Sequence, residues 1–106
     1  MRYPDIESHG VVGNLRTAAL IGNDATVSFF CFPRFDSPSV FLSLLDPDRG
    51  GSFSIRPVDA DMRTRQMYLP DTNVLVTRFM SQLGMAEVTD YMPLSATGQP
   101  RSALVR

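Results

Sequence analysis

Arg34 and Asp36 are the two charged side chains whose types and spacing best suit contact chemistry. They flank Phe35 directly after the apolar, aromatic run VSFFCF, which stops at Pro33. An arginine donates several fixed hydrogen bonds to hydroxyls or carboxylates, and an aspartate accepts them from sugar hydroxyls. Two interpretations remain open. The pair is structural, with Asp36 helping Ser37 to cap a helix, or the loop contacts a substrate or a neighbouring domain.

The other carboxylates do not predict a catalytic pair. Nine of the eleven acidic residues are aspartates, and aspartate in a turn usually bonds its own backbone or faces solvent. Glu87 and Asp90 have an odd separation in a predicted strand, which directs them to opposite faces of a sheet. Asp5 and Glu7 lie in a polar terminal segment. The aspartates in turn-like contexts are Asp24, Asp46, Asp48, Asp59, Asp61 and Asp71. No catalytic residue is therefore predicted.

Metal, nucleophile and cofactor chemistry have little support. His9 is the only histidine and Cys31 the only cysteine, and neither belongs to a pattern with ligand spacing. Cys31 lies within an aromatic strand, which predicts a buried and inert thiol. Ser8 next to His9 does not make a triad, and Gly50-Gly51 is followed by neither a helix nor a lysine, as a phosphate loop requires. We expect no metal and no cofactor.

Length and composition favour one small globular domain. The chain has 106 residues, of which 43% are hydrophobic and 20% charged. Its formal net charge is −1 and its basic residues do not cluster, which argues against nucleic acid or an anionic membrane as a partner. A single cysteine favours a reducing compartment. The N-terminus has no apolar region typical of a signal peptide. No segment approaches a run of about 18 apolar residues, the length that a membrane-spanning helix needs. We expect a cytoplasmic protein.

Turn residues and apolar alternation predict the first half of the fold. Residues 16–21 and 26–32 are predicted to form a hairpin around the turn Gly22-Asn23-Asp24. Ser37-Pro38 is typical of a helix start, and apolar residues near helical spacing predict one short helix over 38–45. Residues 52–56 are predicted to be extended, and the polar stretch 57–65 to be an exposed loop.

The second half is predicted to be a further hairpin. Residues 73–80 and 85–91 are rich in β-forming residues, with residues 81–84 as a four-residue loop. Residues 73–80 are apolar on both faces, which predicts cover on both sides. Residues 95–100 are predicted to be a loop, and residues 103–105 begin a strand that stops at Arg106. We therefore expect a mostly β, antiparallel sandwich that is incomplete within this chain.

Several blocks of the sequence carry a resemblance to a known family. They are GNLRTAALI (13–21), CFPRFDSPSVF (31–41), GGSFSIRP (50–57), TNVLVTRF (72–79), VTDYMP (88–93) and LVR (104–106). In this order they resemble the N-terminal domain of bacterial glycoside hydrolase family 15 proteins, the glucoamylase-like and trehalase-like enzymes. Two positions depart from the family pattern: Ser28 and Phe29 stand where relatives usually carry aspartate and tryptophan.

The resemblance implies an antiparallel, supersandwich-like β domain that precedes a catalytic (α/α)6 barrel. The barrel of the family carries two glutamates and hydrolyses α-glucosidic bonds, in trehalose or maltooligosaccharides, with inversion. By resemblance, residues 1–106 are then a single non-catalytic N-terminal segment without that barrel. The α-glucoside substrate would be bound mainly by the barrel, with Arg34 and Asp36 as candidate contacts to substrate or barrel.

Two hypotheses without enzymatic activity stay open. The first is a stand-alone sugar-binding module, against which we note that tryptophan is absent and that the phenylalanines fall in predicted core strands. The second is an assembly domain that self-associates, because open sheet edges readily pair with another chain.

Overall fold

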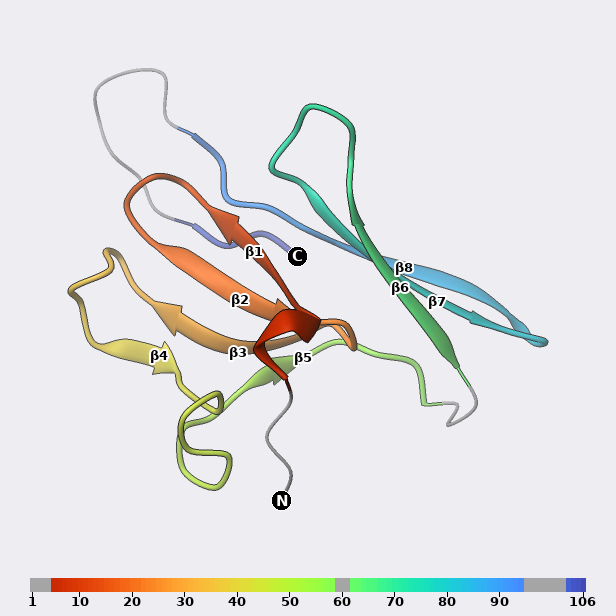
Figure 1. Cartoon of the computed structure of the whole chain (residues 1–106), viewed down its shortest axis with the longest axis horizontal. Coiled ribbons are helices and arrows are strands. Elements are labelled where there is room, and N and C mark those ends of the chain that lie inside the picture. Colours follow the sequence, from red (N-terminus) through yellow and green to blue (C-terminus); the bar gives the residue numbers. More distant parts are fainter. Residues whose placement is uncertain (1–4, 59–61, 95–102) are drawn as a thin grey trace.

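The protein consists of two antiparallel β-sheets in a computed structural model that describes residues 5–58, 62–94 and 103–106 (Figure 1). The first sheet has the strand order β1-β2-β3-β4, with β5 also paired to β3, and the second has the order β6-β7-β8. A short 3-10 helix, η1 (Ile6–Ser8), precedes the strands, which are β1 (His9–Gly13), β2 (Ala18–Gly22), β3 (Thr26–Cys31), β4 (Ser39–Phe41), β5 (Phe53–Ser54), β6 (Arg63–Tyr68), β7 (Leu75–Ser81) and β8 (Gly84–Asp90). The predicted mostly β, antiparallel sandwich is confirmed.

The first predicted hairpin is formed by β2 and β3. The Ala25 N–H donates to the Gly22 carbonyl at 2.9 Å, and the Asp24 carboxylate accepts from the Thr26 N–H at 3.1 Å. The turn is therefore closed by an aspartate that bonds its own backbone, as predicted for this residue. The observed strands differ from the predicted 16–21 and 26–32 by one or two residues at their ends.

The helix predicted over 38–45 is wrong. Residues Ser39–Phe41 form β4, in which Phe41 pairs with Phe30 and Ser39 with Cys31. Two turns follow instead of a helix, in which the Asp46 N–H donates to the Leu42 carbonyl at 3.0 Å and the Gly50 N–H to the Asp46 carbonyl at 2.8 Å. Helix nucleation is unfavourable for so short a segment, and the edge of β3 offers backbone partners at once. Four apolar residues near helical spacing stabilise a helix less than pairing with β3 stabilises a strand.

The second hairpin, β7–β8, is confirmed but its loop is shorter than predicted. Ser81 pairs directly with Gly84, so only Gln82 and Leu83 form the turn rather than the four residues 81–84. The Ser81 hydroxyl accepts from the Leu83 N–H at 3.1 Å, which closes the turn with a side chain. The predicted cover of both faces of β7 holds for its first three residues, which are all buried.

Strand β6 was missed by the sequence analysis. In the predicted loop 57–65, Val58 and residues 63–65 are exposed while Pro57 and Met62 are partly buried. Residues Arg63 to Tyr68 are not a loop but pair along β7, from Arg63 with Met80 to Tyr68 with Leu75. A polar edge strand exposes most of its side chains, so it lacks the alternation by which strands are recognised. Its membership in a sheet is set by its partner rather than by its own composition.

The core joins the two sheets. Its buried side chains come from β1, β2, β3, β7 and the segment after β8, and are Val12, Ala19, Ile21, Val27, Phe30, Leu75 and Met92. β1 and β7 lie close together at Gly10, where an added Cβ would be only 2.7 Å from a methyl of Leu75. Leu104 packs against this core, while the strand predicted at 103–105 is reduced to one bridge between Tyr91 and Val105. The predicted loop 95–100 lies outside the described residues.

Candidate functional site

The loop that carries Arg34 and Asp36 is exposed and internally bonded. The Arg34 Nε lies 3.3 Å from the Asp36 carboxylate, with the two side chains 64% and 74% exposed. The Ser37 hydroxyl accepts from the Arg34 N–H at 3.2 Å, and the Ser37 N–H donates to the Arg34 carbonyl at 3.0 Å. Ser37 thus closes a turn instead of capping a helix. The predicted ion pair exists, and both charged groups remain accessible to a partner.

This loop is attached to the β1–β2 turn. The Phe35 N–H donates to the Arg16 carbonyl at 2.9 Å. Together with residues 68–74 and Leu94, the two loops frame an open groove of about 1,270 Å³ at one end of the sandwich. Phe35, which lies in the predicted loop, is 61% exposed beside this groove. Of the phenylalanines in predicted strands, Phe30 is buried, but Phe32 and Phe53 are 42% and 41% exposed, so the prediction of a core position is wrong for these two. The Arg34–Asp36 pair therefore stands next to an apolar surface.

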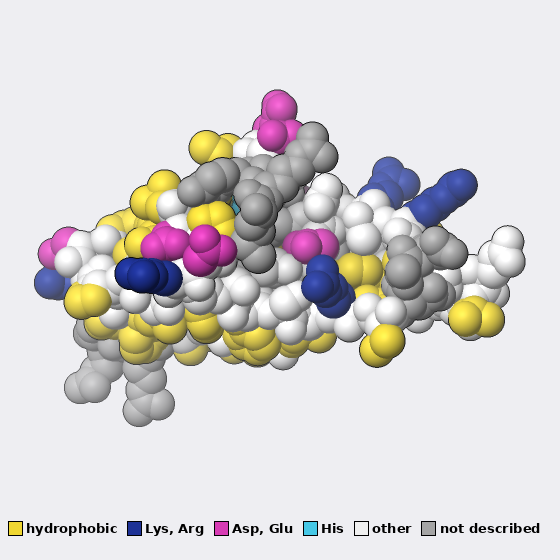
Figure 2. Space-filling view, turned by 90° about the horizontal axis from the view of Figure 1, so that it is seen from below, with side chains coloured by type: hydrophobic (Ala, Val, Ile, Leu, Met, Phe, Trp, Pro, Cys, Tyr) yellow, Lys and Arg dark blue, Asp and Glu magenta, His cyan; other side chains and the backbone are white. Residues whose placement is uncertain are grey.

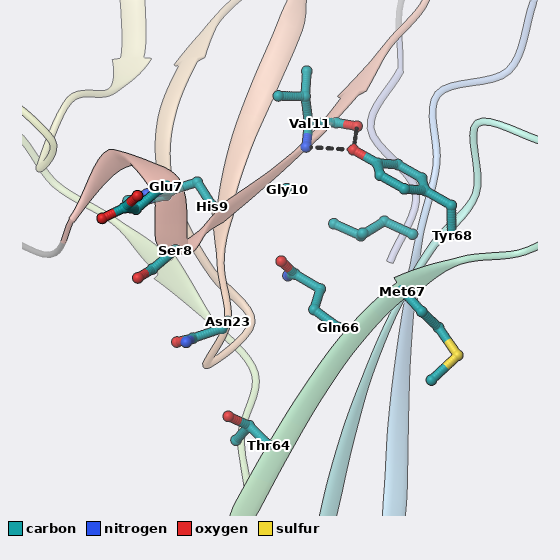
Figure 3. Close-up of a pocket in the computed structure, with 11 residues that line it drawn as sticks. Glu7, Ser8, His9, Gly10, Val11, Asn23, Thr64, Gln66, Met67 and Tyr68 are labelled. Carbon is teal, nitrogen blue, oxygen red and sulfur yellow. Dashed lines mark hydrogen bonds between the residues drawn. The ribbon is translucent and has the colours of Figure 1, made fainter.

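A second, more polar cleft of about 500 Å³ lies between η1, β1 and β6 (Figure 3). The Tyr68 hydroxyl there donates to the Val11 carbonyl at 2.7 Å and accepts from the Val11 N–H at 2.8 Å. The His9 Nδ1 lies 3.0 Å from the Asp5 carbonyl, while its Nε2 is buried without a hydrogen-bond partner. Since Tyr68 bonds to an edge strand of the other sheet, it links the two sheets.

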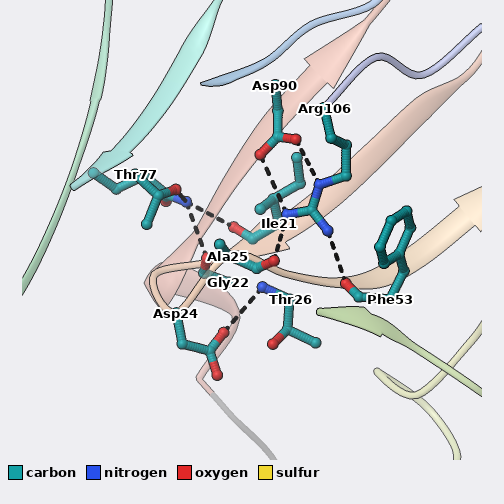
Figure 4. A network of polar contacts seen from close by, with 10 residues as sticks. Ile21, Gly22, Asp24, Ala25, Thr26, Phe53, Thr77, Asp90 and Arg106 are labelled. Carbon is teal, nitrogen blue, oxygen red and sulfur yellow. Dashed lines mark hydrogen bonds and ion pairs between the residues drawn. The ribbon is translucent and has the colours of Figure 1, made fainter. Parts of the chain in front are cut away.

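The strongest electrostatic feature is a buried ion pair that the sequence analysis missed (Figure 4). The Arg106 Nε donates to the Asp90 carboxylate at 2.6 Å, and the two side chains are only 3% and 0% exposed. Arg106 also donates to the carbonyls of Phe53, at 3.0 Å, and Ala25, and its guanidinium lies 4.8 Å from the centre of the Phe53 ring. The pair joins the end of β8 to the β2–β3 turn and to β5.

One residue of this ion pair, Asp90, could in part be placed from the sequence. Glu87 and Asp90 were predicted to face opposite sides, and Glu87 is exposed while Asp90 is buried. A carboxylate on the core face requires a cation or several hydrogen bonds, because burying an unpaired charge is costly. The partner could not be found, since Arg106 is 16 residues away and no strand pattern connects the two.

Three other residues considered in the sequence analysis, Asp46, Cys31 and Ser28, hold a turn or lie buried in the fold. The Asp46 carboxylate accepts from the N–H groups of Asp48, at 3.2 Å, and Arg49, at 3.1 Å, as expected of a turn aspartate. Cys31 is buried, as predicted, and is a free thiol. Ser28, at a position where the resembled family carries an acid, is buried, and its hydroxyl donates to the Leu20 carbonyl at 3.5 Å.

Neither a metal-binding cluster nor a membrane-spanning helix is found in the described part of the chain. Within residues 5–58, 62–94 and 103–106, no three histidine, cysteine, aspartate or glutamate side chains are grouped as a metal site requires. In the same ranges, no helix combines the length and the apolar character needed to cross a membrane. On the face drawn in Figure 2, most charged side chains stand singly or in small groups of mixed sign, and basic side chains lie next to each other at the upper right.

These features define a small two-sheet β domain in which Asp24 and Asp46 hold turns and Asp36, Glu87 and Asp90 form ion pairs. The chain belongs to the trehalase-like N-terminal domain family, which matches residues 1–106. The family membership expected from the motif blocks is thereby confirmed for the trehalase-like branch.

Curated relatives agree with this assignment. A trehalase of Thermoplasma volcanium is 42% identical over 99 residues, which are 92% of this chain and 16% of the relative. Trehalase 1 of Sulfolobus acidocaldarius is 52% identical over 85 residues, or 80% of this chain and 15% of the relative. A trehalase of Mycolicibacterium smegmatis is 35% identical over 89 residues, which are 83% of this chain and 13% of the relative. The chain thus spans about one-sixth or less of the length of these relatives. No solved structure matches it.

Proposed function

We propose that this chain is the non-catalytic N-terminal domain of a trehalase-like glycoside hydrolase of family 15, which acts on α-glucosidic bonds in the cytoplasm. The observation that carries the proposal is the family match over residues 1–106, together with relatives named trehalase that are six to seven times longer than the matched segment. Trehalose is the first substrate to test, and maltooligosaccharides are the second.

In an inverting glycoside hydrolase, one carboxylic acid protonates the leaving oxygen and a carboxylate activates water on the other side of the sugar. The two groups stand about 6.5–9.5 Å apart to admit that water. Five of the described acids have other partners: Asp90 is buried against Arg106, Asp24 and Asp46 hold turns, and Asp36 and Glu87 pair with arginines. The catalytic carboxyls therefore belong to the remainder of the enzyme.

The domain's own contribution is support of that remainder and, through the Arg34 loop, polar contacts at the substrate entrance. Arg34 and Asp36 favour such a role because they are exposed and fixed in a closed turn. A guanidinium and a carboxylate held 3.3 Å apart present donors and acceptors side by side, which matches the alternating hydroxyls of a sugar. The chain's single cysteine, Cys31, favours a reducing compartment.

The proposal is tested with a chimera. The matched N-terminal segment of Sulfolobus acidocaldarius Trehalase 1 is replaced by this chain, which is 52% identical to it over 85 residues. We expect the chimera to release glucose from trehalose, and the isolated chain to release none. A chimera that folds but does not hydrolyse trehalose or maltose would overturn the proposal, as would turnover by the isolated chain.

A stand-alone sugar-binding module is the rival function. It is favoured by the polar cleft beside Tyr68 and by the exposed ring of Phe35, since exposed aromatic rings can stack on sugars. Titration of the isolated chain with trehalose and maltose, followed by amide chemical shifts, separates the two functions. We expect no shift at Tyr68 or Phe35, whereas saturable shifts there would favour the binding module.

A further inference from the structure

The apolar groove at one end of the sandwich has properties that the isolated chain does not explain. Its exposed lining side chains include Leu15, Phe35, Leu69 and Leu94. They come from four separate segments between or after strands, and none belongs to the core cluster that joins the sheets. Contiguous apolar surface of this kind on a soluble protein marks a contact surface.

Leu15 is the most unusual of these residues. Its side chain is 92% exposed, and its backbone has φ 73°, a left-handed conformation that leucine rarely adopts. The turn does not depend on its side chain, because the Asn14 carboxamide oxygen accepts the N–H groups of Arg16 and Thr17, each at 3.0 Å. Exposure of an apolar side chain and a left-handed backbone both disfavour leucine at this position. A leucine there is therefore evidence for a contact with a surface outside this chain.

The groove also adjoins the loop that carries the family motif. Phe35, between Arg34 and Asp36, lines the groove and is bonded through its N–H to Arg16 in the same turn as Leu15. A surface that fills the groove would therefore meet apolar side chains at its centre and the Arg34–Asp36 pair at its margin. This pattern, an apolar centre with a polar rim, is typical of protein interfaces.

We propose that this groove, with Leu15 and Phe35 as its main contacts, is the surface on which the remainder of the full-length enzyme packs. The inference rests on the proposed function and specifies the face used. The relatives supply the argument for the occupant, because 84–87% of each of the three relatives described lies outside the matched segment, as shares of 16%, 15% and 13% imply. The occupant presents an apolar face to Leu15 and Phe35 and leaves the exposed Arg34–Asp36 pair at the margin of the contact.

The test compares two leucines of equal exposure. Leu15 is 92% exposed in the β1–β2 turn, and Leu83 is 91% exposed in the β7–β8 turn, outside the groove. Leu15→Asp and Leu83→Asp are made in the isolated chain and in the chimera with Trehalase 1. In the isolated chain, Leu15→Asp should leave the unfolding midpoint unchanged or raise it, because aspartate tolerates a left-handed φ. In the chimera, Leu15→Asp should lower the midpoint and Leu83→Asp should not.

Amide hydrogen exchange gives an independent readout. Amides of residues 14–16 and 34–36 should exchange at least about tenfold more slowly in the chimera than in the isolated chain, whereas those of Leu83 and its neighbours should not change. Equal exchange at residues 14–16 in both proteins, or equal midpoints for the two aspartate variants of the chimera, would overturn the assignment. So would a concentration-dependent dimer of the isolated chain that Leu15→Asp abolishes, since the occupant would then be a second copy.

Failure of this inference and failure of the proposed function are distinguishable. A chimera that hydrolyses trehalose while its groove amides exchange as in the isolated chain keeps the proposed function and removes the groove assignment. A chimera with protected groove amides but no turnover keeps the docking surface and removes the proposed activity.

Discussion

Asp90→Ala is predicted to be severely destabilising, because it leaves the Arg106 guanidinium buried without its counter-charge. The Arg106 side chain is 3% exposed, and its Nε lies 2.6 Å from the Asp90 carboxylate. Removing one partner of a buried ion pair costs about 3–5 kcal/mol. That loss is a large share of the roughly 5–15 kcal/mol by which a domain is stable. The remaining bonds of Arg106 to the Phe53 and Ala25 carbonyls cannot replace a negative charge.

The assay is urea unfolding of the isolated chain, followed by circular dichroism, with two comparison variants. Glu87→Ala removes a half-exposed partner 3.6 Å from Arg78 and should cost about 0–1 kcal/mol. The double variant Asp90→Leu/Arg106→Met removes both buried charges and should recover most of the stability lost in Asp90→Ala. A free energy of unfolding for Asp90→Ala within about 1 kcal/mol of the unchanged chain, the scale expected of an exposed pair, would refute the reasoning.

Three further predictions concern stability and kinetics. Gly50→Ala should prevent the native loop from closing, because its Cβ would lie 2.3 Å from the Leu42 carbonyl oxygen, a backbone atom; a native-like thermal midpoint would contradict this. Thr17→Val should cost about 1–3 kcal/mol in urea unfolding, since it removes the buried hydroxyl that donates to the Cys31 carbonyl, and Thr17→Ser should retain most of that stability. Arg34→Ala should change the stability of the isolated chain by less than about 1 kcal/mol, yet lower kcat/KM for trehalose in the chimera; unchanged kinetics would remove the substrate role of this loop.

The elements that could be predicted were those with a local cause. The β2–β3 hairpin follows from a β-branched and aromatic run on one side of a Gly-Asn-Asp turn, and Asp24 closes that turn with its own side chain. Burial of Cys31 follows from the aromatic strand around it. Opposite placement of Glu87 and Asp90 follows from strand geometry alone.

The elements that could not be predicted depend on partners distant in sequence. β6 is polar and exposed, so only its pairing with β7 makes it a strand. Ser39–Phe41 joins the edge of β3 instead of starting a helix, because pairing with an existing strand outweighs a weak helical spacing. The Asp90–Arg106 pair also depends on a distant partner. Strand geometry indicated that Asp90 and Glu87 face opposite sides of the sheet, but no local pattern identified Arg106 as the partner of Asp90.

The groove beside Arg34 shows the same division at the candidate site. The motif block placed Arg34 and Asp36 in a loop, and the structure agrees and shows that both side chains are exposed. It gave no indication that Leu15, in another turn, lines the adjoining groove. That proximity arises because the Phe35 N–H bonds to the Arg16 carbonyl, a contact between two loops that neither sequence segment encodes alone.

The central claim is that this chain supports glycoside hydrolysis carried out elsewhere in a longer enzyme. The most direct measurement is glucose release from trehalose by three purified proteins: the isolated chain, Sulfolobus acidocaldarius Trehalase 1 without its matched segment, and the chimera that carries this chain in place of that segment. We predict turnover by the chimera alone. Turnover by the isolated chain, or a folded chimera without turnover, would contradict the account.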